Sequence, residues 1–313
     1  MGIVKSFAAG NKKSRKGRPG RDRPIEKGQV LLGSDQPFDL DLTLGCGQVF
    51  RWEKKGEWWS GIVEGKVIRV RQAGRTIDWT GADEKFIMRY FHLDLDLPMV
   101  LSSVDRDQVI HSAIERCRGL RLVRQPPWEC LASYICATYS NIPRIKRQIR
   151  AIATEFGTPV TTGEEEEYAF PPPEVLAGRA DCDLRLCGLG YRAPYLCRTA
   201  ALIQTDPRWA DRIGRLGEEE ARRELMRFPG VGPKVADCVL LFAFQKYGSV
   251  PVDVWIRRIL TRLYPLNGPF RTYESARQFA RSHFGDYAGY AQEYLFCARD
   301  ILVPRSPGQG DSG

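Results

Sequence analysis

The segment "FPGVGPKVADC", Phe228 to Cys238, joins two helical patterns through a short glycine-rich turn. Two glycines around one apolar residue permit a tight chain reversal that leaves backbone amides exposed. Amides that converge at the start of a helix bind anions, including DNA phosphates, without reading the base sequence. On its own, the turn predicts either a plain helix connector or a phosphate-binding hairpin in which Gly230 and Gly232 contact DNA.

Lys234 lies in the first turn of the second helix, where the helix dipole disfavours a cation. A lysine amine is nucleophilic only when it is unprotonated, and in water almost all of it is protonated at neutral pH. Burial and the positive end of a helix both favour the neutral amine. The position therefore indicates either a nucleophile or a cation that pairs with a phosphate beside the hairpin.

Composition limits the class of protein. The 313 residues are 43% hydrophobic, enough for a sizeable core, and no apolar run is long enough for a membrane span or a signal peptide. Residues 1–30 carry nine Lys or Arg and two Asp or Glu, so most of the net charge of +9 lies there. The nine cysteines and three histidines lack metal-ligand spacing. We expect an intracellular monomer, in the cytoplasm or nucleoid of a prokaryote or the nucleus of a eukaryote.

The patterns along the chain predict an α+β fold. Residues 36–127 should form an antiparallel sheet with a few helices, and residues 128–304 a helical body. Residues 1–35 and 305–313 are predicted to be flexible tails, and residues 161–173 a solvated loop. The expected strands are 38–44, 47–52, 57–63, 66–72 and 75–79, with a returning strand at 120–125.

Asp253, in "VPVDVWIRR", follows Lys234 by nineteen residues, between an extended segment and a helical one. This spacing and the hairpin resemble the helix-hairpin-helix Gly/Pro/Asp superfamily of DNA base-excision glycosylases, and within it the eukaryotic-type 8-oxoguanine DNA glycosylases. The similarity extends through "FDLDLTLGCGQVFRW", "ECLASYICATYSNIPRI" and "GLGYRAPY" to "YAGYAQEYLF".

The resemblance implies a glycosylase that also nicks DNA. Lys234 would attack the sugar C1′ of a damaged nucleotide, expel the base, form an imine and allow β-elimination of the 3′ phosphate. Asp253 would stabilise the developing positive charge on the sugar and assist proton transfer. Its plain alternative is a helix N-cap, and both roles can coexist.

The same resemblance implies a pocket for an extruded base. Cys238 and Phe296 would sandwich the base, and Gln292 would bind its Watson–Crick edge. The carbonyl of Gly47 would accept the N7–H that distinguishes 8-oxoguanine from guanine. The alternatives are core packing for Cys238 and Phe296, an exposed helix position for Gln292 and an ordinary turn for Gly47.

On the partner strand, Arg144 and Arg192 match the arginines of the family that contact cytosine, and Tyr191 matches its aromatic wedge. Phosphate contacts are the commoner use of such arginines. Asn141 is also expected at the DNA surface. Tyr139 replaces the asparagine that fills the vacated space in the family. Because tyrosine lacks the paired donor and acceptor of an amide, strict preference for cytosine is put in question.

The predicted partner is damaged double-stranded DNA, with no organic cofactor or redox metal. A structural Na⁺ or K⁺ at the hairpin carbonyls is implied only by the resemblance. Two other interpretations remain, a noncatalytic DNA-binding protein and an alkylbase glycosylase of the same superfamily. The latter usually has no hairpin lysine.

Overall fold

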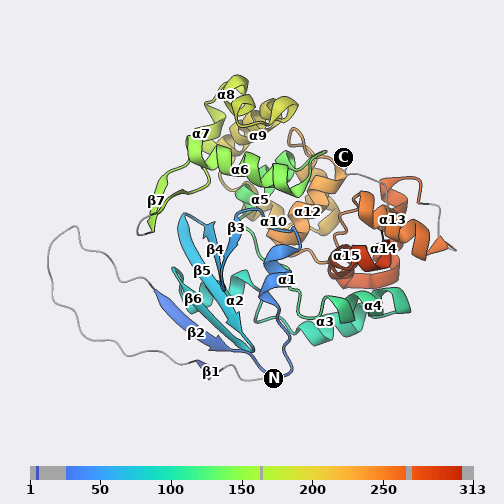
Figure 1. The fold of residues 1–313 in the computed structure, drawn as a ribbon. Coiled ribbons are helices and arrows are strands. Elements are labelled where there is room, and N and C mark those ends of the chain that lie inside the picture. Colours follow the sequence, from blue (N-terminus) through green and yellow to red (C-terminus); the bar gives the residue numbers. More distant parts are fainter. Residues whose placement is uncertain (1–4, 7–25, 163–164, 266–269, 305–313) are drawn as a thin grey trace.

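The computed structural model describes residues 5–6, 26–162, 165–265 and 270–304. An antiparallel sheet lies at one side of the molecule and a helical body at the other (Figure 1). The predicted α+β fold is therefore confirmed. No helix in the described ranges has the length and apolar character that crossing a membrane would require.

The main sheet has the strand order β1-β2-β6-β5-β4-β3, and all of its pairs are antiparallel. Its strands are β1 Lys5–Ser6, β2 Lys27–Leu31, β3 Trp52–Lys55, β4 Trp58–Val63, β5 Lys66–Ala73 and β6 Thr76–Thr80. One face buries side chains such as Ile68, Val70 and Ile77, each fully shielded from solvent. The short helices α1 Leu40–Gly45 and α2 Glu84–Tyr90 contribute to the same hydrophobic core.

Several predictions for this region were wrong. Of residues 38–44, residues 40–44 belong to helix α1, because the Asp39 side chain accepts the Leu42 N–H at 2.8 Å and caps the helix. Of residues 47–52, only Trp52 belongs to a strand. Residues 120–125 form no strand, since their amides donate to side chains and to carbonyls of helices and turns instead of a neighbouring strand.

The predicted N-terminal tail also needs correction. Residues 27–31 of the predicted 1–35 tail form strand β2, which pairs with β6 and buries Val30 completely. Residues 5–6 pair with β2 as well. Residues 1–4, 7–25 and 305–313, which make up most of the predicted tails, lie outside the described residues.

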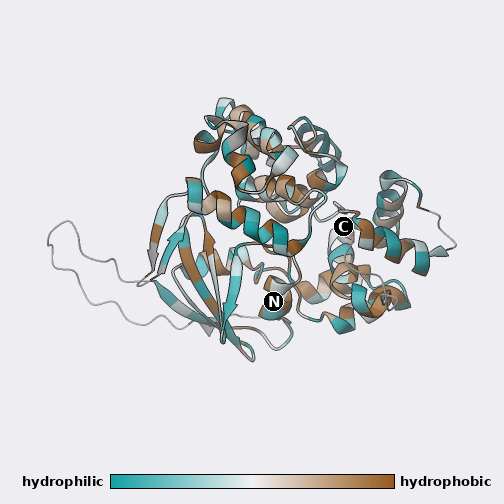
Figure 2. Cartoon of the chain, turned by 45° about the horizontal axis from the view of Figure 1, so that its top comes forward, coloured by the Kyte–Doolittle hydropathy of each residue, from teal (hydrophilic) through white to brown (hydrophobic). Residues whose placement is uncertain are grey.

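The helical body is built around α12 Pro233–Phe244, in which residues 235–243 are all buried. Figure 2 shows hydrophobic residues on the inward faces of the helices and hydrophilic residues on the outward faces. The other long helices are α5 Pro127–Cys136, α6 Ile142–Phe156, α9 Ala193–Thr205, α11 Glu218–Leu225, α13 Val254–Leu263, α14 Tyr273–Phe284 and α15 Ala288–Cys297. Shorter ones are α7 Pro173–Ala177, α8 Asp181–Leu186, η1 Gly190–Arg192, α10 Trp209–Arg215, η3 Gly285–Tyr287 and α16 Arg299–Leu302.

The hydrophobic cores divide the chain differently from the predicted boundary at residue 127. Helices α3 Leu97–Val104 and α4 Gln108–Arg116 pack into the core of the helical body, although they precede that boundary. The predicted loop 161–173 was wrong in part, since β7 Pro159–Thr162 and β8 Glu165–Tyr168 pair as a small hairpin.

Buried charges fix α12 to its neighbours. The Asp237 carboxylate is fully buried and lies 3.1 Å from Nε of Arg222 in α11 and 3.4 Å from Nε of Arg277 in α14. Tyr273 donates its hydroxyl to the same carboxylate at 2.5 Å. These contacts hold the helix that carries Lys234 in a set orientation relative to α11 and α14.

Helix α15 approaches the segment after α12 at Gly289. A Cβ added there would lie 2.6 Å from the Ser249 carbonyl oxygen and 2.8 Å from that of Tyr247, closer than such atoms can pack. The Gly289 N–H also donates to Tyr247 O at 2.7 Å. Only glycine allows this approach, which sets the position of α15.

We predict that Gly289→Ala lowers the free energy of unfolding by about 1–3 kcal/mol, because the added methyl meets two carbonyl oxygens. Gly214→Ala is the matched control, since its Cβ would have Phe244 at 3.7 Å as its nearest neighbour. That exposed helical position should gain about 0.5–1 kcal/mol. Urea unfolding of both variants tests the pair, and equal stability of the two would contradict the close approach.

Candidate active site at the helical hairpin

The hairpin between α11 and α12 has the geometry that its glycines predict. Gly230 has a φ of +80°, and a Cβ there would lie 2.8 Å from the Tyr195 side chain. Thr199 donates its hydroxyl to the Pro229 carbonyl at 2.9 Å and fixes the turn. Gly232 is the N-cap of α12 and supplies no capping side chain. The first amides of α12 are therefore available to an anion.

Lys234 is half-buried in the first turn of α12. Its Nζ lies 5.0 Å from the ring centroid of Tyr134 in α5, and Cys238 lies one turn further along α12. The aromatic face favours a cation at that distance. Tyr134 is thus a platform beneath the predicted nucleophile.

Asp253 has the capping role that the sequence suggested as its plain alternative. It is the N-cap of α13, where its Oδ1 accepts the Ile256 N–H at 2.8 Å. Burial raises the pKa of the Asp253 carboxyl, while the Ile256 N–H and the charge of Lys234 oppose that shift. The fold therefore brings Asp253 and Lys234 into electrostatic contact across nineteen residues of chain.

Two of the residues predicted to hold the base are buried, and one of them, Cys238, lies one turn after Lys234 in α12. Cys238 is buried, and burial raises the pKa of its thiol to about 12, so it remains neutral. Gln292 is 6% exposed, and its Oε1 has no hydrogen-bond partner among the described residues. A buried acceptor without a partner costs free energy unless a ligand supplies the donor. This observation favours ligand binding over an exposed helix position for Gln292.

Gly47 of the sheet domain reaches the same region. Its φ is +110°, and a Cβ there would lie 2.7 Å from Ile142 and 3.9 Å from Phe296. Phe296 is half-buried, with the Arg299 guanidinium 4.3 Å above its ring. The structure therefore places Gly47 beside Phe296, although more than two hundred residues separate them.

The predicted DNA-facing residues divide into exposed and supporting side chains. Tyr139 is 88% exposed and has a φ of +49°. Arg144 is exposed, and Asn141 caps α6 by accepting the Arg144 N–H at 3.0 Å. Tyr191 is half-exposed, and the Arg192 guanidinium lies 4.7 Å from the centroid of its ring.

Arg192 itself is buried, in contrast to the exposed arginine that a base contact would suggest. It donates to the carbonyls of Thr138 at 2.7 Å and Tyr139 at 3.0 Å. In this structure it supports the backbone that presents Tyr139. Its predicted contact with cytosine stays a prediction.

Sequence reasoning missed three residues of this region. Tyr134 contacts Lys234, Glu293 is 3% exposed in α15, and Gln48 is buried between the sheet and the body. A carboxylate inside the apolar pattern "YAGYAQEYLF" was the available signal for Glu293. Neither Tyr134 nor Gln48 had a local signal, because their partners are distant in sequence.

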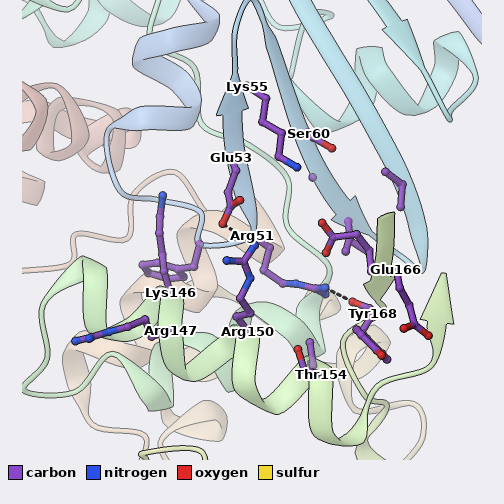
Figure 3. Close-up of a pocket in the computed structure, with 16 residues that line it drawn as sticks. Arg51, Glu53, Lys55, Ser60, Lys146, Arg147, Arg150, Thr154, Glu166 and Tyr168 are labelled. Atoms are coloured by element: carbon purple, nitrogen blue, oxygen red, sulfur yellow. Dashed lines mark hydrogen bonds and ion pairs between the residues drawn. The ribbon is translucent and has the colours of Figure 1, made fainter. Parts of the chain in front are cut away.

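A separate cleft of about 640 Å³ lies between the sheet and α6 (Figure 3). Its lining includes Arg51, Glu53, Lys146 and Arg150, and Arg150 pairs with Glu53 at 3.0 Å. None of the predicted catalytic or base-holding residues lines it.

The fold and the site together define a helix-hairpin-helix DNA glycosylase. The family model for the N-terminal domain of 8-oxoguanine DNA glycosylase matches residues 30–131. A protein of Methanothermobacter thermautotrophicus named "Probable N-glycosylase/DNA lyase" is 37% identical, with 83% of this chain and 92% of that protein covered. The N-glycosylase/DNA lyase of Saccharomyces cerevisiae is 31% identical, with 82% of each chain covered.

A solved structure agrees with these relatives. The Clostridium acetobutylicum 8-oxoguanine glycosylase/lyase, in complex with double-stranded DNA containing cytosine opposite 8-oxoG, is 32% identical. It superimposes with a TM-score of 0.83 over 90% of this chain and 99% of that one. The chain belongs to the 8-oxoguanine DNA glycosylase family.

Proposed function

We propose that this protein excises 8-oxoguanine from duplex DNA and then nicks the strand at the abasic site. The observation that carries the proposal is the electrostatic interaction of Lys234, in the first turn of α12, with Asp253, the N-cap of α13. The buried Gln292, whose Oε1 has no hydrogen-bond partner among the described residues, supports a pocket for the base. Relatives named as N-glycosylase/DNA lyases support both activities. Damaged duplex DNA is the partner, and we place the protein inside the cell, with the genome, as a monomer.

The reaction begins with attack of the neutral Lys234 amine on C1′ of the extruded nucleotide. The electrons of the glycosidic bond leave with the base, which takes up a proton. The attached nitrogen loses a proton, and its lone pair then forms the C1′=N bond as the C1′–O4′ bond breaks and O4′ takes up a proton. The resulting protonated imine acidifies C2′. Loss of a C2′ proton then expels the 3′ phosphate and breaks the strand. Asp253 stabilises the positive charge that develops on the sugar as the glycosidic bond breaks.

The base is held by groups from both parts of the chain. Cys238 and Phe296 face its two sides, and Gln292 binds its Watson–Crick edge. The Gly47 carbonyl accepts the N7–H of 8-oxoguanine and opposes the N7 lone pair of guanine. A missing or repulsive contact of this kind amounts to a few kcal/mol of discrimination.

This chemistry requires no organic cofactor or redox metal in our proposal. A Na⁺ or K⁺ at the hairpin would be held by its carbonyl oxygens. The Pro229 carbonyl already accepts a hydrogen bond from Thr199, so it offers one remaining lone pair. The ion would help to orient the hairpin toward a phosphate.

Borohydride reduction during reaction with an 8-oxoguanine:cytosine duplex should trap a covalent protein–DNA adduct, and Lys234→Gln should abolish it. Lys246→Gln is the matched control, because the Lys246 amine donates a hydrogen bond to the Leu216 carbonyl at 2.6 Å. Denaturing electrophoresis measures the adduct. Persistence of the adduct in Lys234→Gln would reassign the nucleophile to Lys246 or the N-terminal amine.

Asp253→Asn separates capping from catalysis. Asparagine keeps an oxygen that can accept the Ile256 N–H, so the free energy of unfolding should fall by less than about 1 kcal/mol. The rate of base release under single-turnover conditions should fall at least about a hundredfold, because the charge is lost. A large loss of stability with a near-normal rate in the folded fraction would assign Asp253 to capping alone.

Tyr139 should relax the choice of the opposite base, and Tyr139→Asn should restore preference for cytosine by several-fold. Asparagine also tolerates the left-handed backbone at this position, so the variant should fold at least as well. Single-turnover excision opposite each of the four bases measures the preference. Strong cytosine preference in the wild-type protein would show that Tyr139 does not relax it.

A further inference from the structure

The Tyr273 hydroxyl lies between two segments, each of which leads to one residue of the proposed catalytic pair. Tyr273 is the first residue of α14, and a capping box fixes the helix there, with the Thr272 hydroxyl accepting the Ser275 N–H at 3.0 Å. The Tyr273 ring packs against the core of the helical body, and the Arg222 guanidinium lies 5.8 Å from the ring centroid. The hydroxyl therefore has a fixed position inside the helical body.

On one side the hydroxyl binds α12. It donates to Oδ2 of Asp237 at 2.5 Å, and Asp237 is three residues after Lys234. Burial raises the pKa of Asp237 to about 6, while Tyr273, Arg277 and Arg222 oppose the rise, so the carboxylate is ionised at neutral pH. Burial and the charge of Asp237 raise the pKa of Tyr273 well above its ordinary value. The single hydroxyl proton therefore goes to the Asp237 carboxylate.

On its other side the hydroxyl oxygen contacts the chain that leads into Asp253. It accepts the Val252 N–H at 3.4 Å and lies 3.2 Å from the Val250 carbonyl oxygen. Both valines are buried, and Val252 directly precedes Asp253. In the described part of the chain the Val252 N–H has no other hydrogen-bond acceptor. The Tyr273 hydroxyl thus satisfies a buried amide next to the proposed catalytic carboxylate.

One oxygen atom connects the helix of Lys234 with the residue before Asp253. Within residues 26–162, 165–265 and 270–304, no other side-chain hydrogen bond joins α12 to residues 249–253. Lys234 lies in the first turn of α12, and Asp253 is the N-cap of α13. The relative placement of these two helix starts decides how the amine and the carboxylate meet one sugar. A displacement of about 1 Å in such a pair can lower a rate about a hundredfold.

A purely structural role is the competing explanation. Asp237 is fully buried, with Arg222 at 3.1 Å and Arg277 at 3.4 Å. Both arginines also pair with Glu274, so the plain alternative is that Tyr273 only completes the partners of a buried carboxylate. Loss of a bond that merely stabilises the fold affects every step of the reaction alike. Loss of a positioning bond affects the step that needs both catalytic groups.

We propose that Tyr273 is a positioning residue for base release. Its hydroxyl, held by the Asp237 carboxylate, sets the place of Asp253 relative to Lys234 through the Val252 N–H. Base release needs both groups, because the amine attacks C1′ while the carboxylate stabilises the positive charge on the sugar. Nicking at a preformed abasic site needs the amine but breaks no glycosidic bond. Loss of the hydroxyl should therefore slow base release more than nicking. This inference rests on the proposed function.

The experiment compares Tyr273→Phe with the wild-type protein on two duplexes, one with 8-oxoguanine and one with a preformed abasic site, each opposite cytosine. Single-turnover rates with excess protein are measured for base release from the first, after alkaline cleavage, and for nicking of the second. Tyr264→Phe is the matched control, since its hydroxyl donates to the Asp107 carboxylate at 3.1 Å. Asp107 keeps His283 as a partner at 2.6 Å, and Tyr264 lies at the opposite end of α13 from Asp253.

We expect Tyr273→Phe to slow base release at least about tenfold and nicking of the abasic duplex less than about threefold. Tyr264→Phe should change neither rate by more than about twofold, although it also loses one hydroxyl bond to a carboxylate. Thermal unfolding should show a lowered melting temperature in both variants. The ratio of the two rates within one protein does not depend on its folded fraction, so it separates positioning from stability.

Equal slowing of both steps in Tyr273→Phe would overturn the inference, since the hydroxyl would then support the fold or Lys234 alone. Wild-type rates in that variant would overturn it as well, and so would a variant that fails to fold. The same split between the steps in Tyr264→Phe would also overturn it, because any loosening of the helical body would then suffice. In all of these cases the wild-type protein still releases 8-oxoguanine. A wild-type protein that releases no base and forms no borohydride adduct would instead contradict the proposed function.

Discussion

The hydrogen bonds of Gln48 join the two parts of the molecule, and the active site depends on that joint. The buried side-chain amide donates to the carbonyls of Thr43 at 2.7 Å and Arg121 at 2.9 Å, and accepts the Val123 N–H at 2.9 Å. The Gln48 carbonyl accepts from Tyr134, whose ring also lies beneath Lys234. One residue thereby couples the Gly47 turn of the sheet to the helix platform under the nucleophile. Removing it would leave several buried polar groups unpaired at once.

Helix α15 is the second surface of the site, and it is buried along most of its length. The close approach at Gly289 fixes the distance of α15 from the segment that follows α12. The Tyr294 hydroxyl donates to the Leu120 carbonyl at 2.8 Å and fixes the rotation of α15 about its own axis. A helix so constrained can present Gln292 to a ligand without the entropy cost of ordering it at binding. The same rigidity explains how an unpartnered oxygen and a buried carboxyl persist in the folded protein. The favourable packing of the rest of α15 offsets the free-energy cost of burying these two polar groups.

The parts of the fold and site that the sequence predicted are those with local signals. The hairpin, Lys234 and the cap at Asp253 follow from glycine, helix-start and spacing rules that act over a few residues. Helix α1 was mistaken for a strand because "FDLDLTL" alternates with a period of two, whereas the Asp39 cap and packing decide the conformation. Residues 120–125 look like a strand, but their hydrogen bonds go to side chains brought there by the tertiary fold. For the same reason the support that Arg192 gives Tyr139 could not be predicted.

Capping and catalysis at Asp253 depend on the same geometry. A carboxylate at an N-cap is held in place by the amides of the helix it begins, so its position is fixed by the backbone rather than by a flexible side chain. The Ile256 N–H occupies Oδ1, and the N-terminal dipole of α13 favours the ionised form against the cost of burial. Lys234 likewise lies in the first turn of a helix, α12. Both members of the proposed catalytic pair are therefore placed by the backbone of a helix N-terminus.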